Sequence, residues 1–343
     1  MRIALLGLEQ GGKRTLFELL TGRAVPEGRK PDEPVEGIAR IRDARVDVLS
    51  ELCHPDETTY AQNHFVLCPD LSGGNGRQHW LEIARRSDLL CPVVRAFESD
   101  EVYHPAGTVD PDRDRRELEA EFVLHDLAMV EQRLDRLTRE LKSGHTPERD
   151  RELAALDKIK PVLEAEGDPG DAALDPQEQA TLEQLGLLCL KPRLWCYNVS
   201  EDDVARDFGP GTFSVSARIE REIAELGDAA ERAEYLASLG LEATGLDRLN
   251  AAAYDLLGLM SFYTIGSDEV RAWTVRKGAT APVAGAKIHT DIGRGFIRVE
   301  VIKYDDIVAA GSERAARDKG KVQVRGRDYV MEDGDVCHFL FNV

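Results

Sequence analysis

Apolar positions in the first hundred residues follow two patterns, one typical of buried strands and one typical of helices. Short apolar runs predict strands at 3–6, 65–68 and 89–97. Apolar residues three or four positions apart predict helices at 16–20, 43–52 and 78–86. The segment 22–42 is rich in proline, glycine and charge, and we predict a long loop there. Alternating strands and helices are typical of a parallel sheet covered by helices.

The pattern changes near residue 113, where apolar residues form the seam of a long amphipathic helix. That seam consists of Leu127, Val130, Leu134, Leu137 and Leu141. A turn is predicted at 143–147, and a second seam consists of Leu153, Leu156, Ile159 and Leu163. Two such helices predict an antiparallel hairpin, which usually serves packing and sometimes docking. The segment 167–177 is rich in Asp, Gly and Pro and is predicted to be a linker.

The strand-and-helix pattern resumes after the linker and then gives way to a compact C-terminal pattern. Strands are predicted at 193–197 and 213–215, and a helix follows with Ile219, Ile223 and Leu226 on one face. Further strands are predicted at 270–275, 295–301, 322–324 and 338–341. A helix near 305–309 lies among these last strands, and their order suggests a β-grasp-like module.

The composition is that of an ordinary globular protein, with 42% hydrophobic and 31% charged residues. No apolar run is long enough to span a membrane and no signal peptide is evident, so we expect a cytoplasmic protein. The six cysteines form no C-x-x-C pair, which argues against a zinc site.

The net charge of −19 argues against nonspecific binding to nucleic acid by the body of the protein. The region 265–330 differs, because 13 Lys and Arg stand there against 9 Asp and Glu, a local balance of +4. This region could meet RNA, or it could be a solvated surface of mixed sign.

The strongest chemical signal is the stretch Gly7-Leu8-Glu9-Gln10-Gly11-Gly12-Lys13-Arg14-Thr15, which lies between a predicted strand and a predicted helix. In the pattern G-x-x-x-x-G-K-[ST], backbone N–H groups surround a phosphate, the Lys neutralises the outer phosphates and the hydroxyl holds Mg²⁺. Gly7, Gly12 and Lys13 fit this pattern, whereas Arg14 occupies the hydroxyl position. A glycine-rich turn before a helix is also common without phosphate binding, so the rest of the chain has to decide.

Two further loops follow predicted strands and complete a candidate nucleotide site. Asn198-Val199-Ser200-Glu201 follows one strand, and Ser216-Ala217 follows the next. Ligands of doubly wound sheets bind at the carboxyl ends of the strands, so these loops can converge with the phosphate loop on one nucleotide.

These residues resemble the YchF family of Obg-type P-loop ATPases, and the resemblance runs nearly end to end. The phosphate loop with Leu16-Phe17, the segment 33–49 and the segment 93–100 are similar to that family. The most specific matches are 198–201, 270–274, 285–291, 295–298 and 333–343. The resemblance implies a C-terminal TGS-type module, adenine preference, and a cytoplasmic nucleotide-binding protein associated with ribosomes, translation and stress.

Base selectivity has a physical basis as well. Guanine-specific relatives carry Asn-Lys-x-Asp, whereas here Val199 replaces the Lys and Glu201 replaces the Asp. A site built on such hydrogen bonds can discriminate by roughly 10⁴-fold, so this change can alter specificity. The residues by themselves exclude neither ATP nor GTP.

Four departures from the family pattern surround the metal and the terminal phosphate. Arg14 replaces the Ser that binds Mg²⁺, and Pro31 stands where a switch Thr would bind it. Leu67 replaces the Asp of the Asp-x-x-Gly switch, and Asp70 replaces its Gly. Because Mg²⁺ is central to phosphoryl transfer, its binding here is doubtful and we predict weak or lost hydrolysis.

Arg14 admits three interpretations. Its guanidinium could lie against the phosphates and replace part of the Mg²⁺ charge. It could instead fill the pocket and pair with Glu9 or Asp70, which would abolish binding. It could also be turned to solvent beside a defunct loop.

The predicted fold class is α/β: a doubly wound P-loop NTPase sheet, an inserted α-helical coiled-coil hairpin and a C-terminal β-grasp (TGS-like) domain. The predicted domains are 1–112 and 185–262 for the two parts of the NTPase domain, 113–184 for the hairpin and 263–343 for the TGS-like domain. The candidate nucleotide-binding residues are Gly7, Gln10, Gly11, Gly12, Lys13, Arg14, Thr15, Asn198, Val199, Glu201, Ser216 and Ala217. No catalytic or metal-binding residue is assigned.

We therefore expect a monomeric YchF-like pseudo-ATPase that binds ATP ahead of GTP. Its partner would be the ribosome or RNA, reached through the TGS-like domain and the hairpin, with no membrane involved. One alternative is an active Mg²⁺-dependent ATPase or GTPase in which Thr15 serves the metal. The other is an adaptor that binds RNA or the ribosome without any nucleotide.

Overall fold

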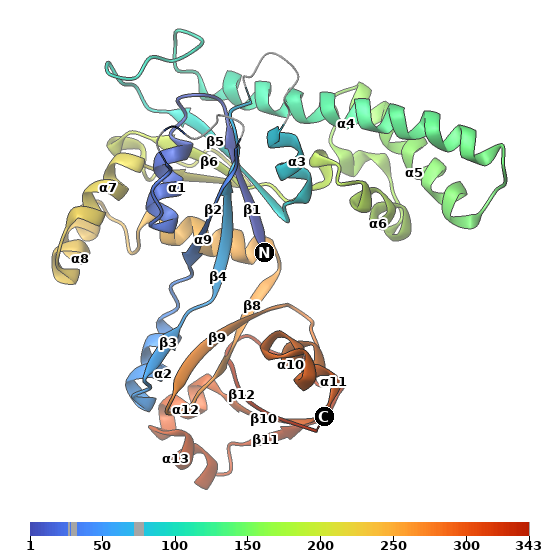
Figure 1. Cartoon of the computed structure of the whole chain (residues 1–343). Helices are drawn as coiled ribbons and strands as arrows, with labels where there is room; N and C mark the ends of the chain where they lie inside the picture. The colour runs from blue at the N-terminus through green and yellow to red at the C-terminus, as the bar shows by residue number, and fades with distance from the viewer. Residues whose placement is uncertain (27, 29–32, 72–78, 343) are drawn as a thin grey trace. The chain divides into compact units, whose positions relative to one another are not determined.

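A computed structural model of the chain describes residues 1–26, 28, 33–71 and 79–342 (Figure 1). The chain divides into two compact units. The first contains Met1–Gly37 and His64–Leu246, and the second contains Ile38–Asn63 and Asp247–Val343. The segment 38–63, which the sequence analysis placed in the N-terminal domain, therefore clusters with the C-terminal residues. Pro31, the predicted turn at 72–76 and the first residue of the predicted helix 78–86 lie outside the described residues.

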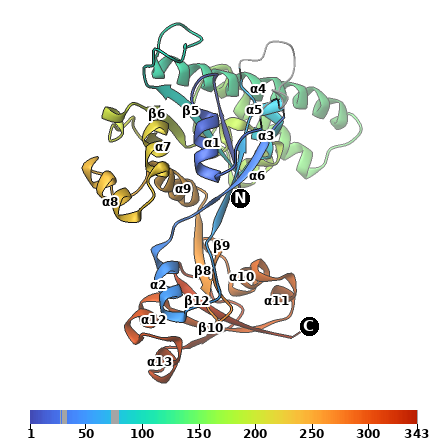
Figure 2. The same ribbon diagram turned by 60° about the vertical axis from the view of Figure 1, so that its left-hand side comes forward.

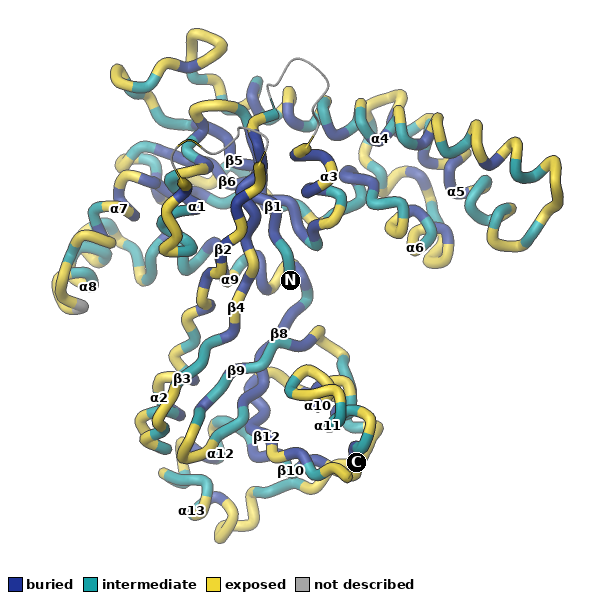
Figure 3. The backbone as a smooth tube through the Cα atoms, viewed as in Figure 1, coloured by how far each residue is buried: buried dark blue, intermediate teal, exposed yellow. Residues whose placement is uncertain are grey.

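The first sheet has the strand order β2-β4-β1-β5-β6-β7. Its strands are β1 (Arg2–Gly7), β2 (Val35–Arg40), β4 (Gln62–Leu67), β5 (Leu89–Ala96), β6 (Trp195–Val199) and β7 (Thr212–Val215). β1 pairs in parallel with β4 and β5, and β5, β6 and β7 also pair in parallel. The central strands β1, β5 and β6 are buried along most of their length (Figure 3), which explains their continuous apolar runs.

Helices of the first unit include α1 (Lys13–Thr21), α3 (His79–Arg86), α7 (Ala217–Glu225) and α8 (Ala229–Ser238), and α9 (Gly245–Leu256) begins at its end. The predicted α/β alternation is confirmed, but the prediction of an uninterrupted loop over 22–42 is wrong for Val35–Arg40. Buried and exposed residues alternate along this strand. That alternation is a strand signal, which Pro34 before the strand and Gly37 within it obscured.

The predicted hairpin consists of α4 (Pro111–Leu141) and α5 (Pro147–Glu164), which lie side by side in Figure 1. Both helices start with a proline after a capping side chain, Asp110 for α4 and Thr146 for α5. Buried apolar residues of both helices belong to one core that also includes residues of the sheet. Asp126 in the middle of α4 is fully buried.

The predicted linker 167–177 is partly helical. It contains the 3₁₀ helix η1 (Pro169–Ala172) and the first two residues of α6 (Pro176–Leu185). Asp175 and Glu178 form a capping box that begins α6, and Pro176 occupies its first turn. A second 3₁₀ helix, η2 (Leu188–Leu190), leads to β6.

The second unit has its own sheet, with the order β11-β10-β12-β8-β9-β3. The strands are β3 (Glu57–Thr59), β8 (Leu259–Thr264), β9 (Glu269–Arg276), β10 (Phe296–Lys303), β11 (Gln323–Arg325) and β12 (Asp335–Phe341). The helices are α2 (Ala44–Cys53), α10 (Ala281–Ile288), α11 (Thr290–Arg294), α12 (Tyr304–Ala310) and α13 (Glu313–Asp318). α10 and α11 lie beside one another next to this sheet (Figure 2).

Among the described residues, no helix is both long and apolar enough to cross a membrane.

Candidate nucleotide-binding site

The loop between β1 and α1 requires glycine at two positions. Gly7 has a φ of +147°, and a Cβ there would lie 2.4 Å from the carbonyl oxygen of Val93. Gly12 has a φ of +91°, and a Cβ there would lie 2.2 Å from Nδ2 of Asn198. Any larger residue would clash at either position, so both glycines allow the loop to lie tightly against β5 and β6.

Two adjoining cavities surround this loop. The first, of about 500 Å³, is lined by residues 9–15 together with Leu67, Cys68 and Asp70, and we call it the phosphate cavity. The second, of about 440 Å³, is lined by the loops after β5, β6 and β7 and by α7, and we call it the base cavity. Both cavities share Gln10, Gly12 and Thr15. Every sequence-predicted site residue except Gly7 lines one of the two.

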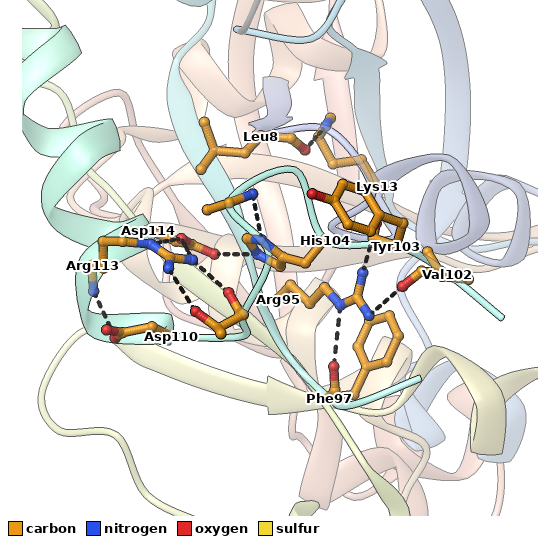
Figure 4. A network of polar contacts seen from close by, with 12 residues as sticks. Leu8, Lys13, Arg95, Phe97, Val102, Tyr103, His104, Asp110, Arg113 and Asp114 are labelled. Carbon is orange, nitrogen blue, oxygen red and sulfur yellow. Dashed lines mark hydrogen bonds and ion pairs between the residues drawn. The ribbon is translucent and has the colours of Figure 1, made fainter. Parts of the chain in front are cut away.

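Lys13 lines the phosphate cavity. Its side chain is buried, and its ammonium donates a hydrogen bond to the carbonyl oxygen of Leu8 (Figure 4). Nζ of Lys13 also lies 2.6 Å from Oδ1 of Asp70. Burial lowers the pKa of Lys13, and the neighbouring Asp70 carboxylate acts against that shift. The lysine expected to meet the outer phosphates is therefore paired with a carboxylate of the chain itself.

Arg14 points along α1. Its Nε lies 3.2 Å from Oε1 of Glu18, and its Nη2 donates to the carbonyl oxygen of Val25 at 2.9 Å. The side chain is 57% exposed, although Arg14 also lines the phosphate cavity. The carboxylate that pairs with Arg14 is thus Glu18, whereas the second interpretation expected Glu9 or Asp70. Asp70 pairs with Lys13 instead.

The side chains at the metal positions do not fit Mg²⁺, which takes oxygen ligands. Arg14 offers only donors, and Leu67 is a buried hydrocarbon at the end of β4. Asp70 does carry oxygens, but its carboxylate pairs with Lys13. Within the described part of the chain, no group of three or more His, Cys, Asp or Glu side chains could hold a metal ion.

Asn198 connects the two cavities. Its buried side-chain amide donates to the carbonyl oxygen of Gly11 at 3.1 Å and accepts from the backbone N–H of Ala217 at 3.0 Å. Ser216 caps α7 by accepting from the N–H of Ile219. One side chain therefore joins the phosphate loop to the loop that starts α7.

The two replaced base-contact positions differ in burial. Val199 is buried at the end of β6, and Glu201 is exposed at the start of the 3₁₀ helix η3 (Glu201–Asp203). Both line the base cavity. An exposed carboxylate on the rim can accept hydrogen bonds from an amino group of a base.

Sequence reasoning missed the loop between β5 and α4, which forms one wall of the base cavity through Phe97, Glu98 and Val102. Buried Arg95 organises this wall by donating to the carbonyl oxygens of Phe97 at 3.1 Å and Val102 at 2.9 Å (Figure 4). An arginine inside an apolar strand is the sequence signal that could have indicated such a role, because buried guanidinium groups need acceptors.

The same loop is fastened to the start of α4. The backbone N–H of Ala106 donates to Nδ1 of His104 at 3.1 Å, so Nε2 of His104 donates to Oδ2 of Asp114 at 2.9 Å (Figure 4). Arg113 donates to the other oxygen of Asp114 at 2.7 Å. The loop that forms a wall of the base cavity is therefore hydrogen-bonded to the start of the hairpin.

Comparison with known proteins finds similarity along the whole chain. Residues 259–342 match the family model described as "YchF-GTPase_C: Protein of unknown function (DUF933)". The chain is 40% identical over 362 aligned positions to the "Ribosome-binding ATPase YchF" of Haemophilus ducreyi, covering 100% of this chain and 99% of that protein. The chain belongs to the YchF family.

Other YchF proteins agree. The "Ribosome-binding ATPase YchF" of Bacillus subtilis is 37% identical over 364 aligned positions, with 99% of this chain and 98% of that protein covered. The solved structure of the "Schizosaccharomyces pombe YchF GTPase" superposes with a TM-score of 0.84 at 27% identity, covering 99% of this chain and 97% of that one. The predicted family and fold class are confirmed.

Proposed function

We propose that this chain binds a purine nucleoside phosphate, ATP ahead of GTP, across the two cavities, without Mg²⁺ and with little or no hydrolysis. One observation supports this most strongly. Gly7 and Gly12 let the loop lie tightly against β5 and β6 in the form of a phosphate loop, while Arg14 and Leu67 occupy the metal positions. The loop can hold phosphate through backbone N–H groups and the start of α1.

The argument against hydrolysis is energetic. In phosphoryl transfer the protein mainly positions the phosphates, and Mg²⁺ neutralises the charge that develops on them. Losing the metal site would remove several kcal/mol of transition-state stabilisation, and each ~1.4 kcal/mol is a factor of ten in rate. A metal-free site would therefore retain binding far better than turnover.

The preference for adenine is proposed from the base cavity. Val199 offers no amine or long stem beside a base, and Glu201 carries its carboxylate one methylene further from the backbone than an Asp would. Both changes disturb the contacts that select guanine. Two bacterial relatives are named ATPases and the yeast relative is named a GTPase, so the family names leave the choice to experiment.

We further propose that the chain acts beside the ribosome in the cytoplasm, as a monomer. The bacterial relatives are named ribosome-binding. The local charge balance of +4 over 265–330 would suit an RNA surface. On this proposal the C-terminal TGS-like domain and the hairpin provide the contacts.

The test is isothermal titration of the purified chain with ATP, ADP and GTP, each with Mg²⁺ and with EDTA. The proposal expects binding that survives EDTA, with ATP at least several-fold tighter than GTP. Binding that requires Mg²⁺, together with phosphate release, would favour an active ATPase in which Thr15 serves the metal. No binding of any nucleotide at millimolar concentration would favour the nucleotide-independent adaptor.

Arg14→Ser extends this test. Because Arg14 pairs with Glu18 and with the carbonyl of Val25, the substitution should change nucleotide affinity in EDTA by less than about threefold. A loss of tenfold or more would mean that the guanidinium serves the phosphates.

A further inference from the structure

The Lys13–Asp70 ion pair affects which phosphate groups of a nucleotide can reach Lys13. Lys13 is the phosphate-loop lysine, and such a lysine reaches the β- and γ-phosphates of a bound nucleotide. Here its ammonium lies 2.6 Å from a carboxylate oxygen of Asp70. The Lys13 side chain is only 6% exposed, whereas that of Asp70 is 49% exposed, and both residues line the phosphate cavity.

We propose that Asp70 is a specificity-determining residue that occupies Lys13 in place of a terminal phosphate and thereby makes the site favour a nucleoside diphosphate over a triphosphate. This inference rests on the proposed nucleotide-binding function of the same site. It concerns the carboxylate that this chain carries at position 70, where the family pattern has a glycine.

The physical argument is competition between anions for one cation. A terminal phosphate that reached Lys13 would come within a few ångströms of the Asp70 carboxylate, and like charges at that distance repel strongly when partly buried. No metal ligand at Arg14 or Leu67 is present to offset that repulsion. A diphosphate lacks the γ-phosphate, and backbone N–H groups of the glycine loop can hold its β-phosphate, so it brings less negative charge to the Lys13–Asp70 pair.

Asp70 lies in the segment that follows β4 and pairs with Lys13, the first residue of α1. Glu9 lines the same cavity, but it lies on the phosphate loop itself. Glu9→Gln therefore removes one negative charge from the same cavity and leaves the Lys13–Asp70 pair in place. It serves as the matched control for Asp70→Asn, which removes the charge at the lysine and preserves the shape of the side chain.

The experiment titrates wild type, Asp70→Asn and Glu9→Gln with ATP, ADP and inorganic tripolyphosphate in EDTA, with thermal unfolding as a check that each variant is folded. Wild type should bind ADP at least fivefold more tightly than ATP. Asp70→Asn should tighten ATP and tripolyphosphate at least tenfold, and ADP by less than threefold. Glu9→Gln should tighten each ligand by clearly less than Asp70→Asn does.

The affinities of the two variants support or overturn the role proposed for Asp70. An Asp70→Asn variant whose affinity for ATP and tripolyphosphate is unchanged, weaker or no better than that of Glu9→Gln overturns it, even if wild type binds nucleotide. Tripolyphosphate binding gained by Asp70→Asn supports it even if no variant binds ATP or ADP, in which case the proposed nucleotide function fails separately. Equal tightening of ADP and ATP overturns the claimed preference.

Discussion

Asn198 is the residue on which the geometry of the candidate site depends most. Its amide bridges Gly11 in the phosphate loop and Ala217 at the start of α7, and a Cβ at Gly12 would collide with it. The residue type was predictable from sequence, because Asn begins the base-contact loop. Its structural task was not, because the partners lie 187 and 19 residues away.

Asn198→Ala should weaken ADP binding about tenfold or more. The substitution leaves the carbonyl of Gly11 and the N–H of Ala217 without their partner, and a buried unpaired polar group costs about 1–3 kcal/mol. Titration calorimetry measures the loss. Equal affinity of the alanine variant and wild type would contradict the bridging role.

The ion-pair partners of Arg14 and Lys13 could not be predicted from the sequence. Sequence comparison indicated that Arg14 and Asp70 were unusual, but it could not show that Asp70 takes Lys13 while Glu18 takes Arg14. Local spacing favours Arg14–Glu18, an i,i+4 pair on α1. The Lys13–Asp70 pair joins the start of α1 to the segment after β4, and such contacts depend on the tertiary fold.

At the scale of elements, the apolar pattern predicted many segments, including the short strand β11, and missed others, including the helix α9 and the strand β3. The helices α4 and α5 were predicted from their apolar seams, and strands β5, β6 and β12 from their apolar runs. The strand β3 has three residues, of which none is buried, so it carries no pattern of its own. It pairs with β9, more than 200 residues away, and its stability comes from that pairing.

Within the first unit, a buried carboxylate joins the hairpin to the segment that precedes β6. Asp126 on α4 accepts hydrogen bonds from the backbone N–H groups of Leu188 at 3.0 Å and Cys189 at 2.7 Å. Burial raises the pKa of Asp126, and these two donors act against that shift. A polar residue in the middle of a helix thus fixes where the 3₁₀ helix η2 meets α4.

Asp126→Ala should therefore lower the free energy of unfolding by about 3 kcal/mol, because two buried N–H groups lose a charged acceptor. Urea denaturation followed by circular dichroism measures the change. Asp135→Ala, on an exposed position of the same helix, should change stability by less than about 0.5 kcal/mol. Equal effects of the two substitutions would show that the Asp126 contacts are not anchoring.

At the scale of the whole molecule, the second unit has a network of hydrogen bonds and ion pairs of its own. In the second unit, Asp43 caps α2 and accepts from Arg45 at 2.9 Å and from the hydroxyl of Tyr263 at 2.5 Å. Burial acts to raise the pKa of Asp43, but the hydrogen bonds from Arg45 and Tyr263 outweigh it and lower the pKa. Arg45 also donates to Asp333 at 2.6 Å.

This network makes the stability of the chain pH-dependent. Because the folded-state pKa of Asp43 is lowered, its contribution is present above the unfolded-state pKa of about 3.9 and is lost as pH falls through the folded value. Asp43→Asn should reduce stability near neutral pH and flatten the loss on acidification, measured as urea midpoints from about pH 7 to about pH 3. Asp318→Asn, exposed on α13, should leave that profile as in wild type. A parallel shift of the Asp43→Asn profile would contradict the assignment.

The architecture of both units was largely predictable, because it follows from apolar periodicity and from glycine-rich turns. It was harder to predict which segments of the chain form the second unit. Its sheet combines β3 with strands from the last 85 residues, and no local pattern links them. The candidate site was predictable as a set of loops, whereas its base-cavity wall depends on Arg95 donating to carbonyls of its own loop.

The central claim is that this chain keeps a nucleotide site and has lost turnover. The most direct test is a single-turnover assay with protein in excess over γ-labelled ATP and with Mg²⁺ present, in which bound ATP and released phosphate are measured in the same sample. The account predicts bound ATP and no phosphate release above the protein-free rate. Mg²⁺-dependent phosphate release that disappears in the Lys13→Ala variant would contradict it.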